Sequence, residues 1–229
     1  MIAYNLERIL GELPSGVKLV AVSKFHPMHT VLEAYQQGQR AFGENRPQEF
    51  AMKAVQLPQD IEWHFIGHLQ TNKLKLVLPY ASLVESIDSV HLLDAVNAWG
   101  ERNDRSVKVL LEVHIGAEQS KSGFAPEDVP ELLRSVLAAR EAGLSDGAYP
   151  RIVFCGLMGM ASNTDDEEIV RSDFARIETL FDSCRERFPG LKEFRELSIG
   201  MSGDWRIALE YGSTEVRIGT AIFGERQYL

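Results

Sequence analysis

Cysteine is scarce in this sequence and long apolar runs are missing, and both absences narrow the class of protein. The 229 residues include only Cys155 and Cys184, which suits a reduced, cytoplasmic chain better than a disulfide scaffold. No CxxC spacing occurs, and no histidine spacing supports a metal site. No apolar run approaches the ~18 residues of a membrane span. The start, "MIAYNLERIL", predicts an amphipathic helix instead of a signal peptide.

The sequence also lacks a surplus of basic charge. Lys and Arg number 24 against 33 Asp and Glu, which gives a net charge of −9. A general nucleic-acid binder usually carries a basic face, so this balance disfavours that class. A small basic site can still occur in an acidic protein, and the acidic surface is compatible with a monomer.

Short apolar runs alternate with longer helical patterns along the whole chain. Runs that are apolar nearly throughout are typical of parallel strands covered on both faces. The predicted strands are 17–22, 41–43, 63–66, 83–85, 107–113, 152–157, 196–199 and 215–218. Between them, stripes such as Val170, Phe174 and Ile177 predict helices, and Thr164 with Glu167 predicts a capping box.

Eight strands alternating with helices in a chain of this length predict a TIM-type (β/α)8 barrel. A doubly wound open sheet is the alternative fold. No break in composition and no Pro/Ser-rich linker divides the chain. We therefore expect residues 1–229 to form a single domain with an N-terminal helix.

A lysine stands at the end of the first predicted strand. In a barrel of this kind the functional groups lie just after the strands, at their carboxyl ends, and Lys24 takes that place. Partial burial lowers the pKa of an amine, and the neutral amine can then form a Schiff base with an aldehyde. The alternative interpretation is a surface lysine whose stem lies along the strand end.

Two stretches near the C-terminus place glycine beside a hydroxyl residue. They are "GMSGDW" (200–205), with Ser202 and Gly203, and "RIGTAIFG" (217–224), with Gly219 and Thr220. Glycine lets backbone N–H groups approach an anion, and the loops after strands 7 and 8 are the usual phosphate site of this barrel. The alternatives are that Ser202 only caps a helix and that Gly219 only turns the chain.

Arg217 lies inside an otherwise apolar strand, two residues before Gly219. Arginine is one of the partners that proteins offer to the ring nitrogen of pyridoxal phosphate (PLP). Because it stays charged, it leaves that nitrogen unprotonated and makes the cofactor a weaker electron sink. The alternative is a structural ion pair with Glu215 or Glu225.

Several motifs together resemble the YggS/PROSC family of PLP-binding proteins. The resemblance extends from the first strand to the C-terminus, and its most specific stretch is "WHFIGHLQTNK". The motifs are "AVSK" (21–24), "FGENRPQE" (42–49), "WHFIGHLQTNK" (63–73), "KSGF" (121–124), "GLM" (156–158), "SIGMSGDW" (198–205) and "VRIGTAIFG" (216–224). One departure is Phe25, where a small polar residue is commoner in the family.

The resemblance implies an alanine racemase-type barrel, PLP fold type III, with PLP held as a Schiff base on Lys24. It implies phosphate contacts from four residues, the arginine toward the pyridine nitrogen, and three further neighbours of the ring. The implied cofactor-binding residues are Lys24, Asn45, His64, Met201, Ser202, Gly203, Arg217, Gly219 and Thr220.

The family is associated with PLP homeostasis, so the resemblance implies a carrier or regulator with no established catalytic residue. Such a protein holds PLP and is expected to pass it to apo-enzymes. The alternatives are a PLP-dependent racemase or decarboxylase and a cofactor-free Schiff-base lyase. Barrel racemases carry a second, β-rich domain, whereas this chain ends at Leu229 soon after the last strand. Lys24 supplies only one of the two proton-transfer positions that stereoinversion needs.

Overall fold

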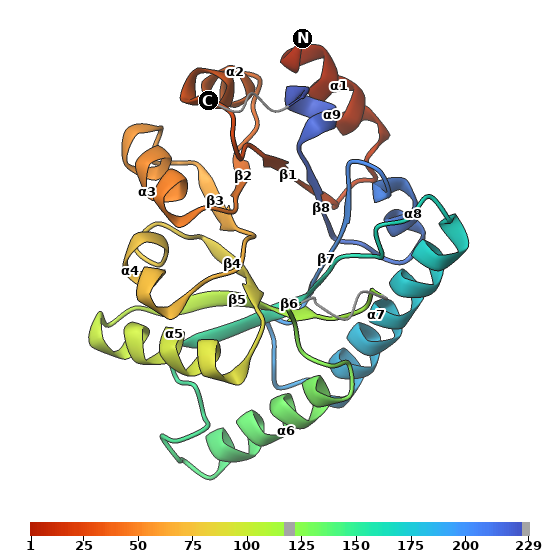
Figure 1. The fold of residues 1–229 in the computed structure, drawn as a ribbon. Coiled ribbons are helices and arrows are strands. Elements are labelled where there is room, and N and C mark those ends of the chain that lie inside the picture. Colours follow the sequence, from red (N-terminus) through yellow and green to blue (C-terminus); the bar gives the residue numbers. More distant parts are fainter. Residues whose placement is uncertain (117–121, 226–229) are drawn as a thin grey trace.

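The computed structural model describes residues 1–116 and 122–225, and it is built around a closed parallel barrel (Figure 1). Each strand pairs with the next, and β8 pairs with β1. The strands are β1 (Lys18–Val22), β2 (Ala41–Glu44), β3 (Glu62–Phe65), β4 (Leu83–Ile87), β5 (Val107–Val113), β6 (Ile152–Gly159), β7 (Glu196–Met201) and β8 (Glu215–Ile218). The prediction of a (β/α)8 barrel is confirmed, and the open-sheet alternative is wrong. Lys121, the first residue of the "KSGF" motif, lies outside the described residues.

Helices surround the barrel on its outer face (Figure 1). They are α1 (Ile2–Glu12), α2 (Met28–Gln36), α3 (Pro47–Gln56), α4 (Leu74–Val77), α5 (Val90–Arg102), α6 (Asp128–Glu141), α7 (Glu167–Arg187), α8 (Trp205–Glu210) and α9 (Thr220–Phe223), with a 3₁₀ turn over Thr71–Lys73. The helices α1 and α9 lie side by side, because Asn5 of α1 donates a hydrogen bond to the carbonyl of Ile222 in α9 (2.9 Å). Within the described part of the chain, no helix has the length and apolarity to cross a membrane.

The long helix α7 begins differently from the sequence prediction. Asp166 is its N-cap, and the Asp166 carboxylate accepts a hydrogen bond from the backbone N–H of Glu168 (3.0 Å). The Thr164 hydroxyl accepts from the N–H of Asp166 instead of capping the helix (3.1 Å). The predicted Thr164–Glu167 capping box is therefore wrong. Asp caps helices at least as well as Thr, and Asp166 lies two residues nearer the apolar stripe.

The apolar core lies between the strands and the surrounding helices. Around β2 and β3 it is aromatic, with Phe50 of α3 in edge-on contact with Phe65 and Trp63 at centroid distances of 5.6 and 5.9 Å. The interior of the barrel itself is different, because polar and charged side chains from β3, β4, β7 and β8 are buried there. Branched apolar residues usually fill this space, so these polar side chains need partners of their own.

Gly156, in the "GLM" motif, is required by a bulge in β6. The β5–β6 register passes from Val109↔Phe154 to Leu110↔Gly156, which leaves Cys155 as the extra residue. Gly156 has φ +151°, and a Cβ there would lie 1.8 Å from the carbonyl oxygen of Glu196. A side chain at this position would therefore collide with the β7 backbone.

We predict that Gly156→Ala destabilises the fold by roughly 3 kcal/mol or more, because it combines an unfavourable φ with a backbone clash. Denaturant unfolding measures this loss. Gly190→Ala is the matched control, since Gly190 is exposed and a Cβ there meets its nearest atom at 3.5 Å; it should change stability by less than about 0.5 kcal/mol. Equal losses for the two variants would contradict the bulge argument.

Candidate functional site

A cavity of about 240 Å³ opens at the carboxyl ends of the strands. Every predicted site residue except Asn45 and His64 lines this cavity. The lining residues are Val22, Lys24, His26, Ile66, Met158, Met160, Met201, Ser202, Gly203, Arg217, Gly219 and Thr220. The structure thus brings together the segments after β1, β6, β7 and β8, as expected for the functional end of this barrel.

Lys24 enters the cavity from the turn that follows β1. Part of the wall around it is apolar, formed by Ile66 after β3 and by Met158 and Met160 at the end of β6. Lys24 therefore shares the cavity with an apolar wall as well as with the polar turns after β7 and β8.

The two glycine–hydroxyl turns are joined to each other at the cavity wall. The Ser202 hydroxyl accepts a hydrogen bond from the backbone N–H of Gly219 (3.3 Å). A Cβ on Gly219 would lie 3.0 Å from the carbonyl oxygen of Val22, so the turn after β8 lies close against β1. Ser202 is not a helix cap, because α8 has Asp204 as its N-cap.

These turns fit a phosphate in chemistry and in space. Ser202 and Thr220 offer hydroxyl donors and lie beside backbone N–H groups, which are the donors that anion sites use. At Gly203 a Cβ would meet no atom within 4 Å, so the glycine leaves open space at the cavity wall. The residues present therefore fit the phosphate of the cofactor that the sequence implies.

Arg217 is held rigidly at the floor of the cavity. Its Nη1 donates to the Ser198 carbonyl (2.7 Å) and to the Ser198 hydroxyl (2.6 Å), and its Nη2 donates to the Gly159 carbonyl (2.9 Å). Glu85 is the carboxylate paired with it, with Nη1 and Oε2 3.7 Å apart. Arg217 therefore does form an ion pair, as the alternative interpretation expected, but its partner is Glu85 and not Glu215 or Glu225. The side chain is buried, and it lines the cavity.

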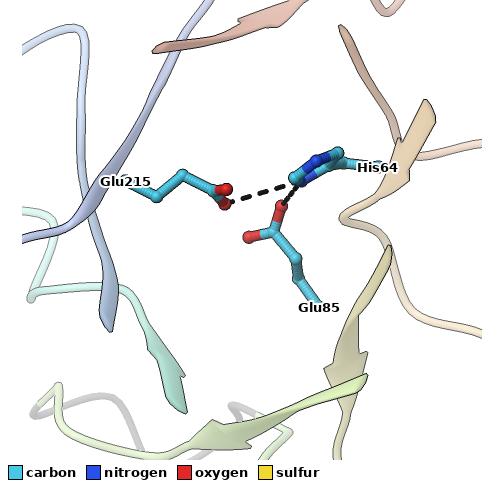
Figure 2. A group of neighbouring side chains, drawn as sticks. All are labelled: His64, Glu85 and Glu215. Carbon is cyan, nitrogen blue, oxygen red and sulfur yellow. Dashed lines mark hydrogen bonds and ion pairs between the residues drawn. The ribbon is translucent and has the colours of Figure 1, made fainter. Parts of the chain in front are cut away.

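Behind Arg217, a buried cluster fills the barrel interior (Figure 2). His64 of β3, Glu85 of β4 and Glu215 of β8 point toward one another. His64 Nδ1 lies 2.8 Å from Glu85 Oε1 and 3.5 Å from Glu215 Oε1. The Ser198 hydroxyl lies 2.6 Å from Glu85 Oε2 and 3.0 Å from Glu215 Oε1. This cluster, called the barrel network below, supports the serine that holds Arg217.

The barrel network shifts the pKa of each of its members. Burial lowers the pKa of His64, but the carboxylates of Glu215 and Glu85 outweigh burial and raise it to about 10. Burial raises the pKa of Glu85, but the hydrogen bond and charge of His64, with the charge of Arg217, lower it to about 2. Burial and the Glu85 charge raise the pKa of Glu215. His64 is therefore an imidazolium at neutral pH.

The same three side chains have the donor set of a metal centre, with a nitrogen and two carboxylates within 4.8 Å of one another. Here the buried carboxylates are already compensated by the His64 imidazolium and by Arg217. A buried pair of carboxylates needs such compensation, and two cations provide it. The arrangement is accordingly that of a salt-bridge network.

His64 and Asn45 lie outside the cavity that the other predicted residues share. His64 is buried in the barrel network and reaches a different cavity, at the amino ends of the strands, beside Lys18 and Cys155. Asn45 follows β2 beside Gly67, where a Cβ would lie 2.2 Å from the Asn45 carbonyl oxygen. The Asn45 side-chain oxygen is buried and has no hydrogen-bond partner among the described residues. Buried amide oxygens are rarely left unpaired, so Asn45 is an exception within the described residues, and its predicted place near a cofactor ring stays a prediction.

His26 is a cavity residue that the sequence analysis missed. It lies two residues after Lys24 in the same turn, and its ring centroid is 5.1 Å from that of Phe223. Its position beside the lysine was the available signal. No local sequence pattern predicts the polar interior of the barrel, because Glu85 and Glu215 stand at the ends of apolar runs and look like ordinary strand-end residues.

Comparison with known proteins gives a consistent match over nearly the whole chain. Residues 1–227 match the family model described as "Alanine racemase, N-terminal domain". A protein of Vibrio alginolyticus named pyridoxal phosphate homeostasis protein is 40% identical over 227 residues, which are 97% of this chain and 92% of that protein.

Solved structures agree with the barrel. PipY of Synechococcus elongatus, solved with PLP bound, is 33% identical and superimposes with a TM-score of 0.84, over 98% of this chain and 100% of that chain. An alanine racemase of Clostridium difficile shares the fold, with a TM-score of 0.78 at 14% identity, and the match covers 99% of this chain and 57% of that chain.

We predict that His64 makes stability depend on pH. Its pKa is raised in the folded state, to about 10, so the folded protein binds a proton more tightly than the unfolded chain. The resulting stabilisation is full below about pH 6.5 and is lost as the pH rises toward 10. In His64→Gln that dependence should be absent, with a loss of a few kcal/mol near pH 6.

Urea unfolding at several pH values measures the effect. The exposed His91 provides the control variant His91→Gln, which should keep the pH profile of the parent protein. A profile for His64→Gln that parallels the parent between pH 6.5 and 10 would show that the imidazole carries no such charge.

Proposed function

The chain belongs to the pyridoxal phosphate homeostasis proteins, within the alanine racemase N-terminal domain family, and from this premise we propose that it holds PLP on Lys24 as a Schiff base, without catalytic turnover. The observation that carries the proposal is the cavity that Lys24 shares with the 202–203 and 219–220 turns. An amine that can react with an aldehyde and hydrogen-bond donors that suit a phosphate thus line the same small cavity.

Capture of the aldehyde is a condensation. The Lys24 amine would add to the aldehyde carbon, and water would leave as the C=N bond formed. PLP would supply the aldehyde, while this chain supplies the amine, the apolar wall and the phosphate donors. Ser202, Gly203, Gly219 and Thr220 are the proposed phosphate contacts, with Met201 and Asn45 as neighbours of the ring.

Arg217 supports holding over catalysis. Its guanidinium is fixed by Ser198 and Gly159 and faces the cavity. Toward a pyridine nitrogen it can only donate, and it keeps its own proton, so the ring stays unprotonated. An unprotonated ring withdraws electrons weakly, and stabilisation of a carbanion is the step that PLP chemistry requires.

Among the alternatives, a racemase would need proton-transfer groups on two faces of its substrate. The titratable bases that line the cavity in the described structure, Lys24 and His26, both come from the turn after β1. This placement disfavours a racemase and favours the carrier. A cofactor-free lyase would use the two joined hydroxyl turns only if its carbonyl substrate carried a phosphate.

Delivery of PLP to apo-enzymes, a monomeric state and a cytoplasmic location complete the proposal. Cys155 and Cys184 are both buried and free, which agrees with a reducing compartment.

We predict that borohydride fixes PLP on Lys24. Hydride reduces the C=N bond to a stable secondary amine, which peptide mass spectrometry locates, and the near-visible absorption of the Schiff base disappears. Lys24→Ala should lose the adduct entirely and keep weaker, phosphate-dependent binding. The exposed Lys75 provides the control variant Lys75→Ala, which should label like the parent protein. An undiminished adduct in Lys24→Ala would remove the assignment.

We also predict that the PLP-loaded protein shows no racemase or decarboxylase turnover on a panel of amino acids. Racemisation is followed by exchange of the α-hydrogen for deuterium, and decarboxylation by release of carbon dioxide. Steady turnover that depends on Lys24 would contradict the carrier function and show that the protein is an enzyme.

A further inference from the structure

The turn that carries Lys24 is strained at its next residue. The N–H of His26 donates to the carbonyl of Ser23 (3.1 Å), which closes a turn over residues 23–26. Within it, Phe25 has φ 67°, in the left-handed region. This region is favourable for glycine and asparagine but costs about 1–3 kcal/mol for other residues unless the surroundings enforce it.

Glu49 enforces the strained residue from α3. Its carboxylate accepts a hydrogen bond from the backbone N–H of Phe25 (2.8 Å). The Arg46 guanidinium lies over the Phe25 ring, 4.2 Å from the centroid. Both residues belong to the "FGENRPQE" motif, whose charged residues have no role in the proposed cofactor contacts.

Ser23, on the other side of Lys24, is held at three atoms. Its N–H donates to the Gly43 carbonyl (3.0 Å), and its hydroxyl donates to Glu44 Oε1 (2.6 Å). Its carbonyl accepts from the Lys53 ammonium (2.8 Å). The backbone is thus fixed immediately before and immediately after the lysine.

Lys53 contacts both the group of residues that holds Ser23 and the carboxylate that holds Phe25. Its side chain is 1% exposed, and its Nζ lies 2.8 Å from the Ser23 carbonyl, 2.6 Å from Glu44 Oε1 and 2.8 Å from Glu49 Oε1. An ammonium has three N–H donors, and here each has an acceptor. Lys53 therefore donates all its hydrogen bonds to groups that hold the turn.

Stability alone does not account for this arrangement. Buried ion pairs are on average no more stabilising than apolar side chains of similar volume. We propose that Lys53, Glu44 and Glu49 form a positioning cluster that fixes the turn over residues 23–26 and so directs the Lys24 amine into the cavity. The inference rests on the proposed capture of PLP by Lys24, and it assigns the role of the buried lysine and of the "FGENRPQE" carboxylates.

The test is a double-mutant cycle on covalent capture. The equilibrium constant for Schiff-base formation is measured by titrating PLP and following the near-visible absorption. Glu49→Ala and Lys53→Met should each lower this constant by about 10- to 100-fold, because small displacements of a reacting group carry such penalties.

Phe25→Gly provides the rescue. Glycine adopts φ 67° without strain, so it needs no carboxylate to hold it there. In the Phe25→Gly protein, Glu49→Ala should therefore lower the capture constant by less than about threefold, a non-additive result that contacting residues give. Additive losses in the double variant would overturn the positioning role.

A second readout uses protein without PLP. The amide N–H of Phe25 should exchange with solvent at least about tenfold faster in Glu49→Ala, because its acceptor is gone. The control for general destabilisation is Tyr149→Phe, which removes a hydrogen bond to Asp94 (2.7 Å) far from the turn. It should lower stability while leaving both the capture constant and the Phe25 exchange rate unchanged.

The outcomes separate the two proposals. A parent protein that forms no reducible adduct on Lys24 overturns the proposed function and this inference with it. A parent protein that forms the adduct, with folded Glu49→Ala and Lys53→Met proteins that capture PLP equally well, overturns the positioning cluster alone. If Lys53→Met does not fold, the Glu49→Ala and Phe25→Gly cycle decides the question without it.

Discussion

The parallel pairing of β1 with β8 is the constraint on which the site depends. Its register, Lys18↔Glu215 through Ala21↔Ile218, places the end of β1 against the end of β8. Lys24 and Gly219 therefore lie on the same cavity although almost the whole chain separates them in sequence. A Cβ on Gly219 would lie only 3.0 Å from the Val22 carbonyl oxygen, so the two strand ends are closely packed. Barrel closure thus places Lys24 beside the 202–203 and 219–220 turns, and local hydrogen bonds fix its position further.

Two groups of charged side chains hold the residues that line the cavity, one near Arg217 and the other near the turn that carries Lys24. The barrel network of His64, Glu85 and Glu215 lies beneath the cavity and supports Ser198, which holds Arg217. The proposed positioning cluster of Glu44, Glu49 and Lys53 lies behind the turn of Lys24. Each group pairs its carboxylates with fixed cations, which reduces the large cost of burying charge. In both cases the charged groups act on a second residue and do not themselves line the cavity.

The sequence predicted the barrel and most of the cavity for one physical reason. Apolar runs mark strands buried on both faces, and their order places the residues after them at one end of the barrel. Where polar residues enter a strand, that signal fails: the predicted strand 83–85 ends at Glu85, whereas β4 continues to Ile87. Glu85 is paired with His64, and the Ser86 hydroxyl donates to the Gly67 carbonyl (2.5 Å), so both remain buried in the strand. Such partners come from distant strands, and no local pattern reveals them.

The same rigidity that suits the cavity to hold a cofactor also limits what it can do. Ser202 and Gly219 are bonded to each other, and Arg217 is bonded to Ser198 and Gly159, so little side-chain freedom remains to be lost on binding. The adaptable part of the wall is apolar, from Met158 and Met160, and offers no proton donor. A preorganised site favours attachment of an aldehyde. A permanently protonated arginine beside the ring would not increase the electron withdrawal that turnover needs. Under the proposed function, retention of PLP without its activation follows from one arrangement of side chains.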